Sequence, residues 1–160
     1  MECTNELLKI VIPGNAISKK NSKKTSLYYK DKRTGRLREL SKPMTYYSKP
    51  YTEWVKSAIQ ACAVAKTKHP HLQFPLTGRY IVKMLFFFNK QMKVDLSNLY
   101  EGIQDVMTGH NSGVARAIPT SAYHLLEDDS VRFILGHDGS RFLLDPANPR
   151  TEVYIIPFSL

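Results

Sequence analysis

Acidic side chains gather in two short stretches of this 160-residue sequence, and their spacing could serve chemistry. One stretch covers residues 95–105, and the other is the run Glu127-Asp128-Asp129. In the first stretch, Asn98, Glu101 and Asp105 are spaced three and four apart and would share one face of a helix. Carboxylate oxygens are ligands that Mg²⁺ prefers, and a bound metal ion can activate water as a nucleophile. The pattern is therefore compatible with a metal-dependent hydrolytic site.

The same acidic residues also have a purely structural interpretation. Asp95 could cap the helix while Glu101 and Asp105 are simply solvated. Asp128 and Asp129 could form a turn. Because these two are adjacent at the start of a predicted strand, their side chains tend to point in opposite directions, and at most one is expected to join the acidic helix face. Spacing alone leaves both interpretations open.

Positive charge is concentrated in one segment. The net charge is +9, and residues 18–42 contain ten bases against two acids, which leaves +8 on this segment and +1 on the remainder. Such a segment attracts polyanions, usually DNA or RNA, although a solvated loop without a partner has the same composition. Acids beside a positive surface repel phosphate unless a cation bridges them, so the two patterns together indicate phosphodiester hydrolysis.

The candidates for phosphate contact lie in two places. We expect contacts from the cluster Lys19, Lys20, Lys23 and Lys24. Arg141 belongs to a predicted turn at 137–141, and this turn either presents the base to a phosphate or is simply a hairpin turn.

Hydrophobic periodicity and turn residues predict the elements that must position these side chains. One helix is expected from Ser48, with Pro50 in its first turn, to about residue 66. A second is expected from about Ser97, which can cap it, to about Met107. Strands are predicted at 7–13, 80–88, 130–136 and 151–158, with a long loop at 108–123.

The order strand, helix, strand, helix, strand, strand indicates one α+β domain with an α/β-like layout. We expect a mixed sheet of about four strands with two helices packed on it, spanning residues 1–160. A basic loop or hairpin would be inserted at about residues 18–45, with 32–36 as its tip. No apolar run is long enough to span a bilayer, and the first residues lack a signal-peptide pattern, so we expect a cytoplasmic protein without a membrane partner.

Two acidic motifs stand in a recognisable order. The first is Asp95-Leu96-Ser97-Asn98-Leu99 with Asp105 following, and the second is Asp128-Asp129-Ser130-Val131. The opening Ile12-Pro13-Gly14-Asn15, which runs into basic residues, and the ending Pro149-Arg150-Thr151-Glu152-Val153 complete the pattern. Together these pieces resemble the RusA family of Holliday junction resolvases over most of the chain, and the pair of acidic motifs is the most specific part.

The resemblance implies a RusA-like fold, an activity and a site. It implies a homodimeric, Mg²⁺-dependent endodeoxyribonuclease, with Mn²⁺ as a substitute metal, that resolves four-way DNA junctions by paired nicks in recombination and repair. Such proteins act in bacterial cells and are often encoded by a phage or prophage. By position, Asp95 and Asp129 match the family's metal-binding carboxylates, with Asp128 beside them.

Two positions depart from the family pattern. Ser97 stands where the family usually has a second aspartate, and Glu101 stands where it usually has a lysine important for cleavage. Serine is a much weaker ligand for magnesium than a carboxylate. Glutamate reverses the charge of a lysine that could stabilise the transition state.

Two accounts of these departures are open. In the first, Glu101, one helical turn from position 97, replaces the missing carboxylate. The positive charge would then come from Lys90, Lys93 or Arg141. This account makes Asp95, Glu101 and Asp129 the catalytic residues and Asp95, Glu101, Asp105, Asp128 and Asp129 the metal ligands. In the second account the site has decayed, and the protein binds branched DNA or RNA without cutting it. The acidic helix face favours the first account, because a pure binder has no use for it.

Overall fold

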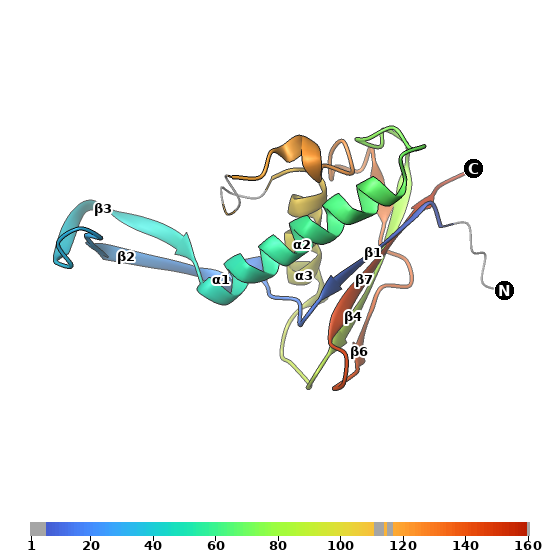
Figure 1. Cartoon of the computed structure of the whole chain (residues 1–160). Coiled ribbons are helices and arrows are strands. Elements are labelled where there is room, and N and C mark those ends of the chain that lie inside the picture. Colours follow the sequence, from blue (N-terminus) through green and yellow to red (C-terminus); the bar gives the residue numbers. More distant parts are fainter. Residues whose placement is uncertain (1–5, 111–113, 115–116, 160) are drawn as a thin grey trace.

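Strands form two sheets in this chain, a five-stranded sheet in the body of the domain and a two-stranded ribbon that projects from it (Figure 1). The structure is a computed structural model that describes residues 6–110, 114 and 117–159. The body sheet has the order β1-β7-β4-β5, and β6 also pairs with β4. Its strands are Leu8–Pro13 (β1), Tyr80–Phe88 (β4), Ile134–Gly136 (β5), Arg141–Leu144 (β6) and Arg150–Pro157 (β7).

Strand directions make the body sheet mixed. β7 is antiparallel to both of its neighbours, β1 and β4, whereas β5 and β6 are parallel to successive parts of β4. The two long helices, Lys49–Lys68 (α2) and Leu96–Met107 (α3), contact each other beside this sheet (Figure 1). The predicted α+β fold with a mixed sheet and two packed helices is confirmed. Two short helices are added, Lys19–Ser22 (α1) and the 3₁₀ turn Thr120–Ala122 (η1).

Burial alternates along β4 and identifies the face on which the helices pack. Val82, Met84 and Phe86 are fully buried, and the residues between them are half-buried. Successive strand side chains point to opposite faces, so the buried set shares one face. The ring of Phe86 lies 5.9 Å from that of Tyr100 on α3. The helices therefore cover this face.

Local signals fix the start of α2. The Ser48 hydroxyl accepts a hydrogen bond from the amide of Tyr51, and Pro50 lies in the first turn, as the sequence predicts. The helix ends at Lys68, two residues beyond the predicted end. Among the described residues, no helix combines the length and the apolar character needed to cross a membrane.

The projecting ribbon, here called the arm, consists of Lys23–Lys30 (β2) and Leu37–Tyr47 (β3). Residues 31–36 form its tip. The two ends of the arm meet at the body, where Lys23 pairs with Tyr47 and the Ser48 amide donates to the Ser22 carbonyl at 2.8 Å. Figure 1 shows the arm extending away from both the sheet and the helices.

Three sequence predictions about elements are corrected. The strand expected at 130–136 is only Ile134–Gly136, because the Ser130 carbonyl accepts from the amides of Phe133 and Ile134 and closes a turn. The helix expected from about Ser97 begins at Leu96, which packs against the core, so the cap position belongs to Asp95 and not to Ser97 as predicted. The predictions also missed β6, a four-residue strand too short to show a period of its own.

Candidate active site and nucleic-acid interface

Helix α3 separates an apolar face from an acidic face, as its spacing predicts. Leu99, Ile103 and Val106 are each about 1% exposed and face the core. Glu101 and Asp105 lie on another face, where they meet a residue from outside the helix. The core contacts of α3 therefore fix the direction in which both carboxylates point.

That outside residue is Lys19. Its Nζ atom lies 3.2 Å from Oε1 of Glu101 and also donates a hydrogen bond to Oδ2 of Asp105. The Lys19 side chain is only 14% exposed. It is the first residue of α1, whose cap Ser18 accepts from the amide of Asn21 at 3.3 Å. The cation thus comes from an element 86 residues away from Asp105 in sequence.

Lys19 contacts two carboxylates, so negative charge exceeds positive charge in this cluster. Burial by itself lowers the pKa of Lys19, but the hydrogen bonds and charges of Asp105 and Glu101 raise it above its ordinary value. The pKa of Asp105 is also raised, first by burial, with the charges of Glu101 and Asp129 adding to the effect against the opposing influence of Lys19. Two carboxylates therefore act on the ammonium group of Lys19, and the charge of a third, Asp129, acts on Asp105.

The second acidic stretch contributes its two aspartates differently. The Asp128 carboxylate accepts from the amide of Ser130 at 2.8 Å, and this hydrogen bond is the main cause of its lowered pKa. Asp129 is the one whose charge acts on Asp105. Asp128 thus holds the turn that replaces the predicted strand start, and Asp129 is the aspartate whose charge influences Asp105 on α3.

Asp95 lies apart from the Lys19 contacts. Its Oδ2 atom accepts from Nδ2 of Asn98 at 3.3 Å. Both residues line an open polar hollow of about 460 Å³ together with Lys20 and Lys93. Asp95 therefore shares this hollow with one base from α1 and one from the loop that precedes α3.

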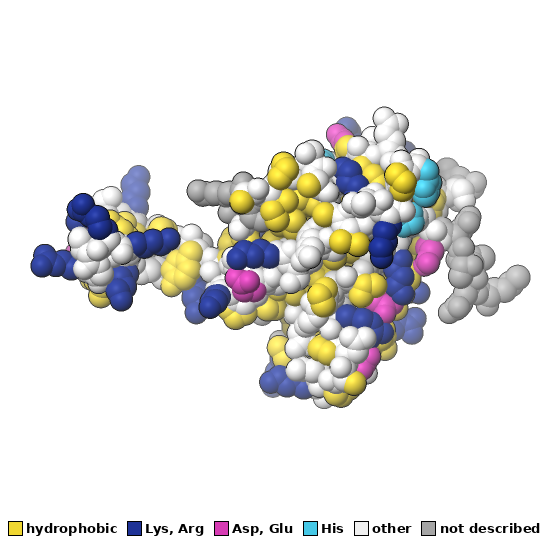
Figure 2. Space-filling view, viewed as in Figure 1, with side chains coloured by type: hydrophobic (Ala, Val, Ile, Leu, Met, Phe, Trp, Pro, Cys, Tyr) yellow, Lys and Arg dark blue, Asp and Glu magenta, His cyan; other side chains and the backbone are white. Residues whose placement is uncertain are grey.

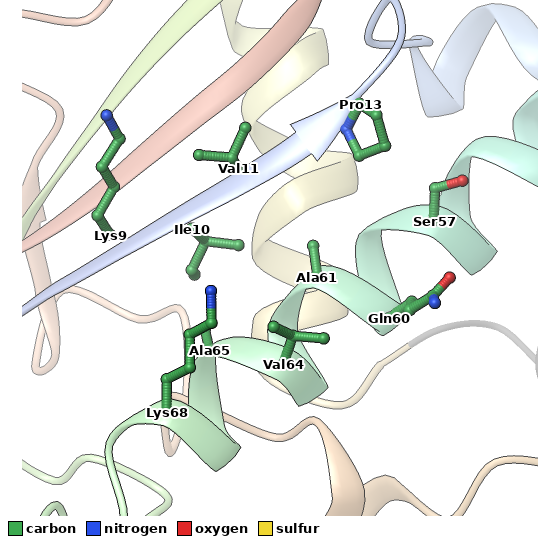
Figure 3. Close-up of a pocket in the computed structure, with 10 residues that line it drawn as sticks. All are labelled: Lys9, Ile10, Val11, Pro13, Ser57, Gln60, Ala61, Val64, Ala65 and Lys68. Atoms are coloured by element: carbon green, nitrogen blue, oxygen red, sulfur yellow. The ribbon is translucent and has the colours of Figure 1, made fainter.

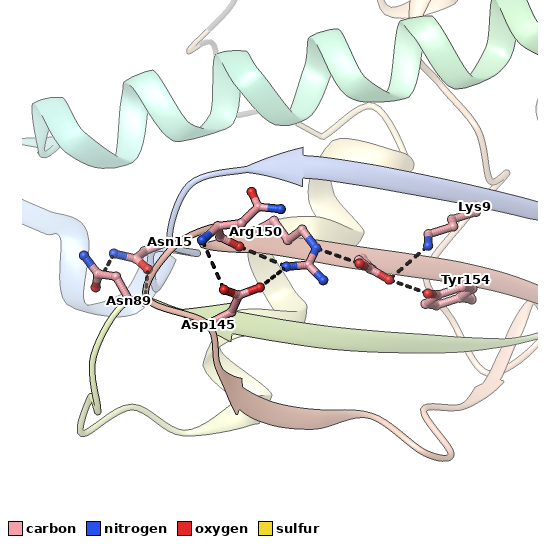
Figure 4. Close-up of polar contacts among 8 residues, drawn as sticks. Lys9, Asn15, Asn89, Asp145, Arg150 and Tyr154 are labelled. Atoms are coloured by element: carbon pink, nitrogen blue, oxygen red, sulfur yellow. Dashed lines mark hydrogen bonds and ion pairs between the residues drawn. The ribbon is translucent and has the colours of Figure 1, made fainter.

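A pair of asparagines holds the segments that carry these residues. Asn15 donates from Nδ2 to Oδ1 of Asn89 at 3.0 Å, and its own Oδ1 accepts from the Asn89 amide at 3.0 Å (Figure 4). Asn15 follows β1 and leads to α1, whereas Asn89 follows β4 and leads to α3. The reciprocal bonds fix the two lead-in segments to each other.

The chemistry of these donors suits magnesium, but their arrangement does not. Carboxylate oxygens are appropriate ligands. Within the described ranges, however, no three or more His, Cys, Asp or Glu side chains converge to hold a metal ion. The cation that lies between Glu101 and Asp105 is the ammonium of Lys19. The ammonium group of Lys19 therefore occupies the position between Glu101 and Asp105 that a metal ion would need.

The predicted phosphate contacts divide between two faces. Lys20, Lys23 and Lys24 are exposed on α1 and the base of the arm, next to Lys19. Arg141 is exposed on β6 opposite Leu85, on the sheet face that the helices leave open. The structure therefore groups the four lysines and leaves Arg141 on a different side.

Basic side chains continue along the arm. On the face seen in Figure 2, lysine and arginine side chains stand out along the outer part of the arm. Residues 23–47 contain eight bases and two acids. The arm also carries exposed apolar and aromatic side chains, namely Leu27, Tyr28, Tyr29, Leu37, Met44 and Tyr46. This combination of bases and aromatic rings is typical of nucleic-acid-binding surfaces.

Two other features lie outside this site. A groove of about 380 Å³ runs between β1 and α2, and none of the described residues that line it is acidic (Figure 3). On the open sheet face, Glu152 accepts hydrogen bonds from Arg150 and Tyr154 and pairs with Lys9 at 3.0 Å (Figure 4). Burial alone would raise the pKa of Glu152, but these three partners lower it to about 2.

Sequence reasoning missed the role of Lys19 as the cation of the acidic face. It named Lys90, Lys93 and Arg141 as sources of positive charge. No spacing rule could link Lys19 to α3, since the contact depends on the path of the chain through α1. The only sequence feature that pointed to this role is that Lys19 follows the turn after the first strand.

Comparisons with protein-family models and with curated proteins found no match for this chain. The resemblance to the RusA family stays a prediction that rests on the motifs themselves.

Proposed function

We propose that this chain is a structure-specific endodeoxyribonuclease of the RusA type that cuts branched DNA, with four-way junctions in recombination and repair as its substrates. The observation that carries the proposal is the position of α1. This helix leads directly into the basic arm, and its first residue, Lys19, contacts the carboxylates of Glu101 and Asp105. A strand of DNA held at the base of the arm would therefore lie against the acidic face of α3.

Charge supports each half of this arrangement. The arm and α1 offer a polyanion many cations, so the duplex would be held mainly through its phosphates. Lys19 offsets the negative charge of the acidic face, which would otherwise repel a phosphate. It is also a donor that could stabilise negative charge developing on a phosphate oxygen. Glu101 and Asp105 are the acids that contact this lysine, and the charge of Asp129 acts on Asp105.

Magnesium, or manganese in its place, is the cofactor we propose from the resemblance. Because Lys19 occupies Glu101 and Asp105, metal binding by these two would require the lysine to release them. A homodimer is proposed on the same basis, since paired nicks across a junction need two sites. The bacterial cytoplasm, with a phage or prophage as the source of the gene, is the corresponding location.

Cleavage of a synthetic four-way junction tests the proposal directly. The purified protein should nick the junction, but not a linear duplex of the same sequence, when magnesium or manganese is present. Asp95→Asn should keep the affinity for the junction and lose nicking, whereas Asp138→Asn, a change in the turn between β5 and β6, should keep both. If the wild-type protein binds junctions but never nicks them with either metal, the proposed nuclease activity is wrong.

One observation favours a second candidate, a branched-DNA- or RNA-binding protein without activity. Lys19 neutralises Glu101 and Asp105 in the way an ordinary structural ion pair does. In that case junction or RNA affinity should be unchanged by chelation of divalent cations, and Glu101→Gln should alter stability only. The same cleavage assay separates the two candidates.

A further inference from the structure

The tip of the arm is a closed and internally bonded loop. Oδ1 of Asp31 accepts from the amide of Arg33 at 2.8 Å and from the amide of Thr34 at 3.0 Å. The Asp31 amide donates to the Arg36 carbonyl at 2.9 Å, and the Gly35 amide donates to the Asp31 carbonyl at 2.8 Å. Gly35 has a φ of +66°, a conformation that glycine adopts without strain. One aspartate thus organises the whole turn.

The organised loop presents basic side chains outward. Lys32, Arg33 and Arg36 are all exposed on it. The Asp31 carboxylate is directed inward instead, with its side chain 17% exposed, and it also lies 3.5 Å from the guanidinium of Arg38. Backbone donors, that of Thr34 first, lower the pKa of Asp31, so it is ionised when it holds the turn. A loop that is already ordered loses less conformational entropy when it binds.

The width of the arm limits which groove of a duplex it can enter. At about 3.3 Å per residue, the eight residues of β2 extend about 26 Å. Two strands about 4.8 Å apart, with side chains on both sides, make a ribbon roughly 10 Å across. The major groove of duplex DNA is about 12 Å wide, and the minor groove is about 6 Å wide. Only the major groove admits such a ribbon without a large deformation of the duplex.

We propose that the tip of the arm enters the major groove of a duplex segment of the substrate, with Lys32, Arg33 and Arg36 as its contacts and Asp31 as the residue that positions them. The inference rests on the proposed function in one respect, namely that the ligand is DNA. Arginine and lysine side chains are suited to this groove, because guanine presents two acceptors there. The net charge of the arm complements the phosphates on both walls of the groove.

A comparison of three variants tests the role of Asp31. Asp31→Ala, Asp31→Asn and Glu39→Ala each remove one negative charge from the arm, and Glu39 is exposed on β3 outside the tip. If charge alone mattered, all three would bind DNA more tightly. We expect Glu39→Ala to bind more tightly and Asp31→Ala to bind at least about fivefold more weakly, because the turn is lost. Asp31→Asn keeps an oxygen acceptor and should bind at least as tightly as the wild type.

Affinity for a fluorescent duplex and for a four-way junction, measured at one fixed salt concentration, gives the answer. If Asp31→Ala binds DNA more tightly than the wild type, as Glu39→Ala is expected to, Asp31 does not position the basic side chains of the tip. Groove-directed competitors then test the placement. Methyl green, which binds in the major groove, should displace the wild type from duplex DNA far more effectively than it displaces Asp31→Ala. Distamycin, which binds in the minor groove, should not displace the wild type. Displacement by distamycin alone, or by neither compound, would overturn the major-groove placement.

These results are separable from the proposed function. A protein that binds DNA through its tip and never cuts contradicts the nuclease and leaves the inference intact. A protein that cuts junctions and responds to Asp31→Ala as it does to Glu39→Ala contradicts the inference and leaves the nuclease intact.

Discussion

The Nζ atom of Lys19 lies 3.2 Å from Oε1 of Glu101 and donates to the neighbouring carboxylate of Asp105. This contact joins α1, at the base of the arm, to the acidic face of α3. It offsets part of the negative charge of that face.

The ion pairs of Lys19 should contribute to stability. In Lys19→Gln, two carboxylates face each other without their shared cation, and we expect a loss of about 1–3 kcal/mol in the free energy of unfolding. Urea denaturation monitored by circular dichroism measures this loss. Lys20→Gln, at the next and exposed position, should change stability by less than about 0.5 kcal/mol. Equal effects at the two positions would contradict the ion-pair contribution.

Divalent cations should bind better when Lys19 is removed. Glu101 and Asp105 are engaged by the lysine in the wild type. In Lys19→Gln both carboxylates become free to accept a metal ion, so magnesium should raise the melting temperature of the variant more than that of the wild type. Thermal shift against magnesium concentration measures the difference, and Lys19→Gln combined with Asp105→Asn should abolish it. Identical shifts in the wild type and Lys19→Gln would show that the lysine does not compete with the cation.

The salt dependence of DNA binding should identify phosphate contacts at the base of the arm. If Lys23 contacts one phosphate, Lys23→Gln should reduce the slope of log affinity against log salt by about 0.9. Lys68→Gln, at the end of α2 beside the groove next to β1, is the matched control and should leave the slope unchanged. Fluorescence anisotropy at four or more salt concentrations provides the slopes. An unchanged slope in Lys23→Gln would mean that this lysine does not touch phosphate.

Acid should destabilise the protein through Glu152. Its pKa is lowered from 4.5 to about 2 in the folded state, so the folded protein binds the proton less readily than the unfolded chain. The stabilisation is present above pH 4.5 and is lost as the pH falls toward 2, by an amount on the order of 2 kcal/mol. Unfolding free energies between pH 2 and pH 7 measure it. Glu152→Gln should flatten this part of the profile, and a profile as steep as that of the wild type would contradict the assignment to Glu152.

Local periodicity predicted much of the fold, because burial enforces it. The alternation along 80–88 and the three-and-four spacing of Leu99, Ile103 and Val106 each place a buried face toward the core. The cap at Ser48 was equally readable, since its hydrogen bond spans only three residues. These elements are specified by neighbours in the sequence.

The remainder depends on contacts between distant residues or on a single side chain. The Asp128 side chain bonds the Ser130 amide and helps to turn the chain where β propensity indicated a strand. β6 is defined by its pairing with β4, and Lys19 reaches α3 through the path of α1. Of the candidate site, the acidic face of α3 could be predicted, and the cation opposite it could not.

The meeting of the two ends of the arm has a consequence for how this protein can vary. Ser22 and Ser48 are joined by a backbone hydrogen bond, so the 25 residues between them leave and rejoin the body at one point. An insertion of this kind can lengthen, shorten or change its sequence while the body keeps its core. A chain in which a short turn replaces residues 23–47 should therefore keep the sheet, the two long helices and the core that they share.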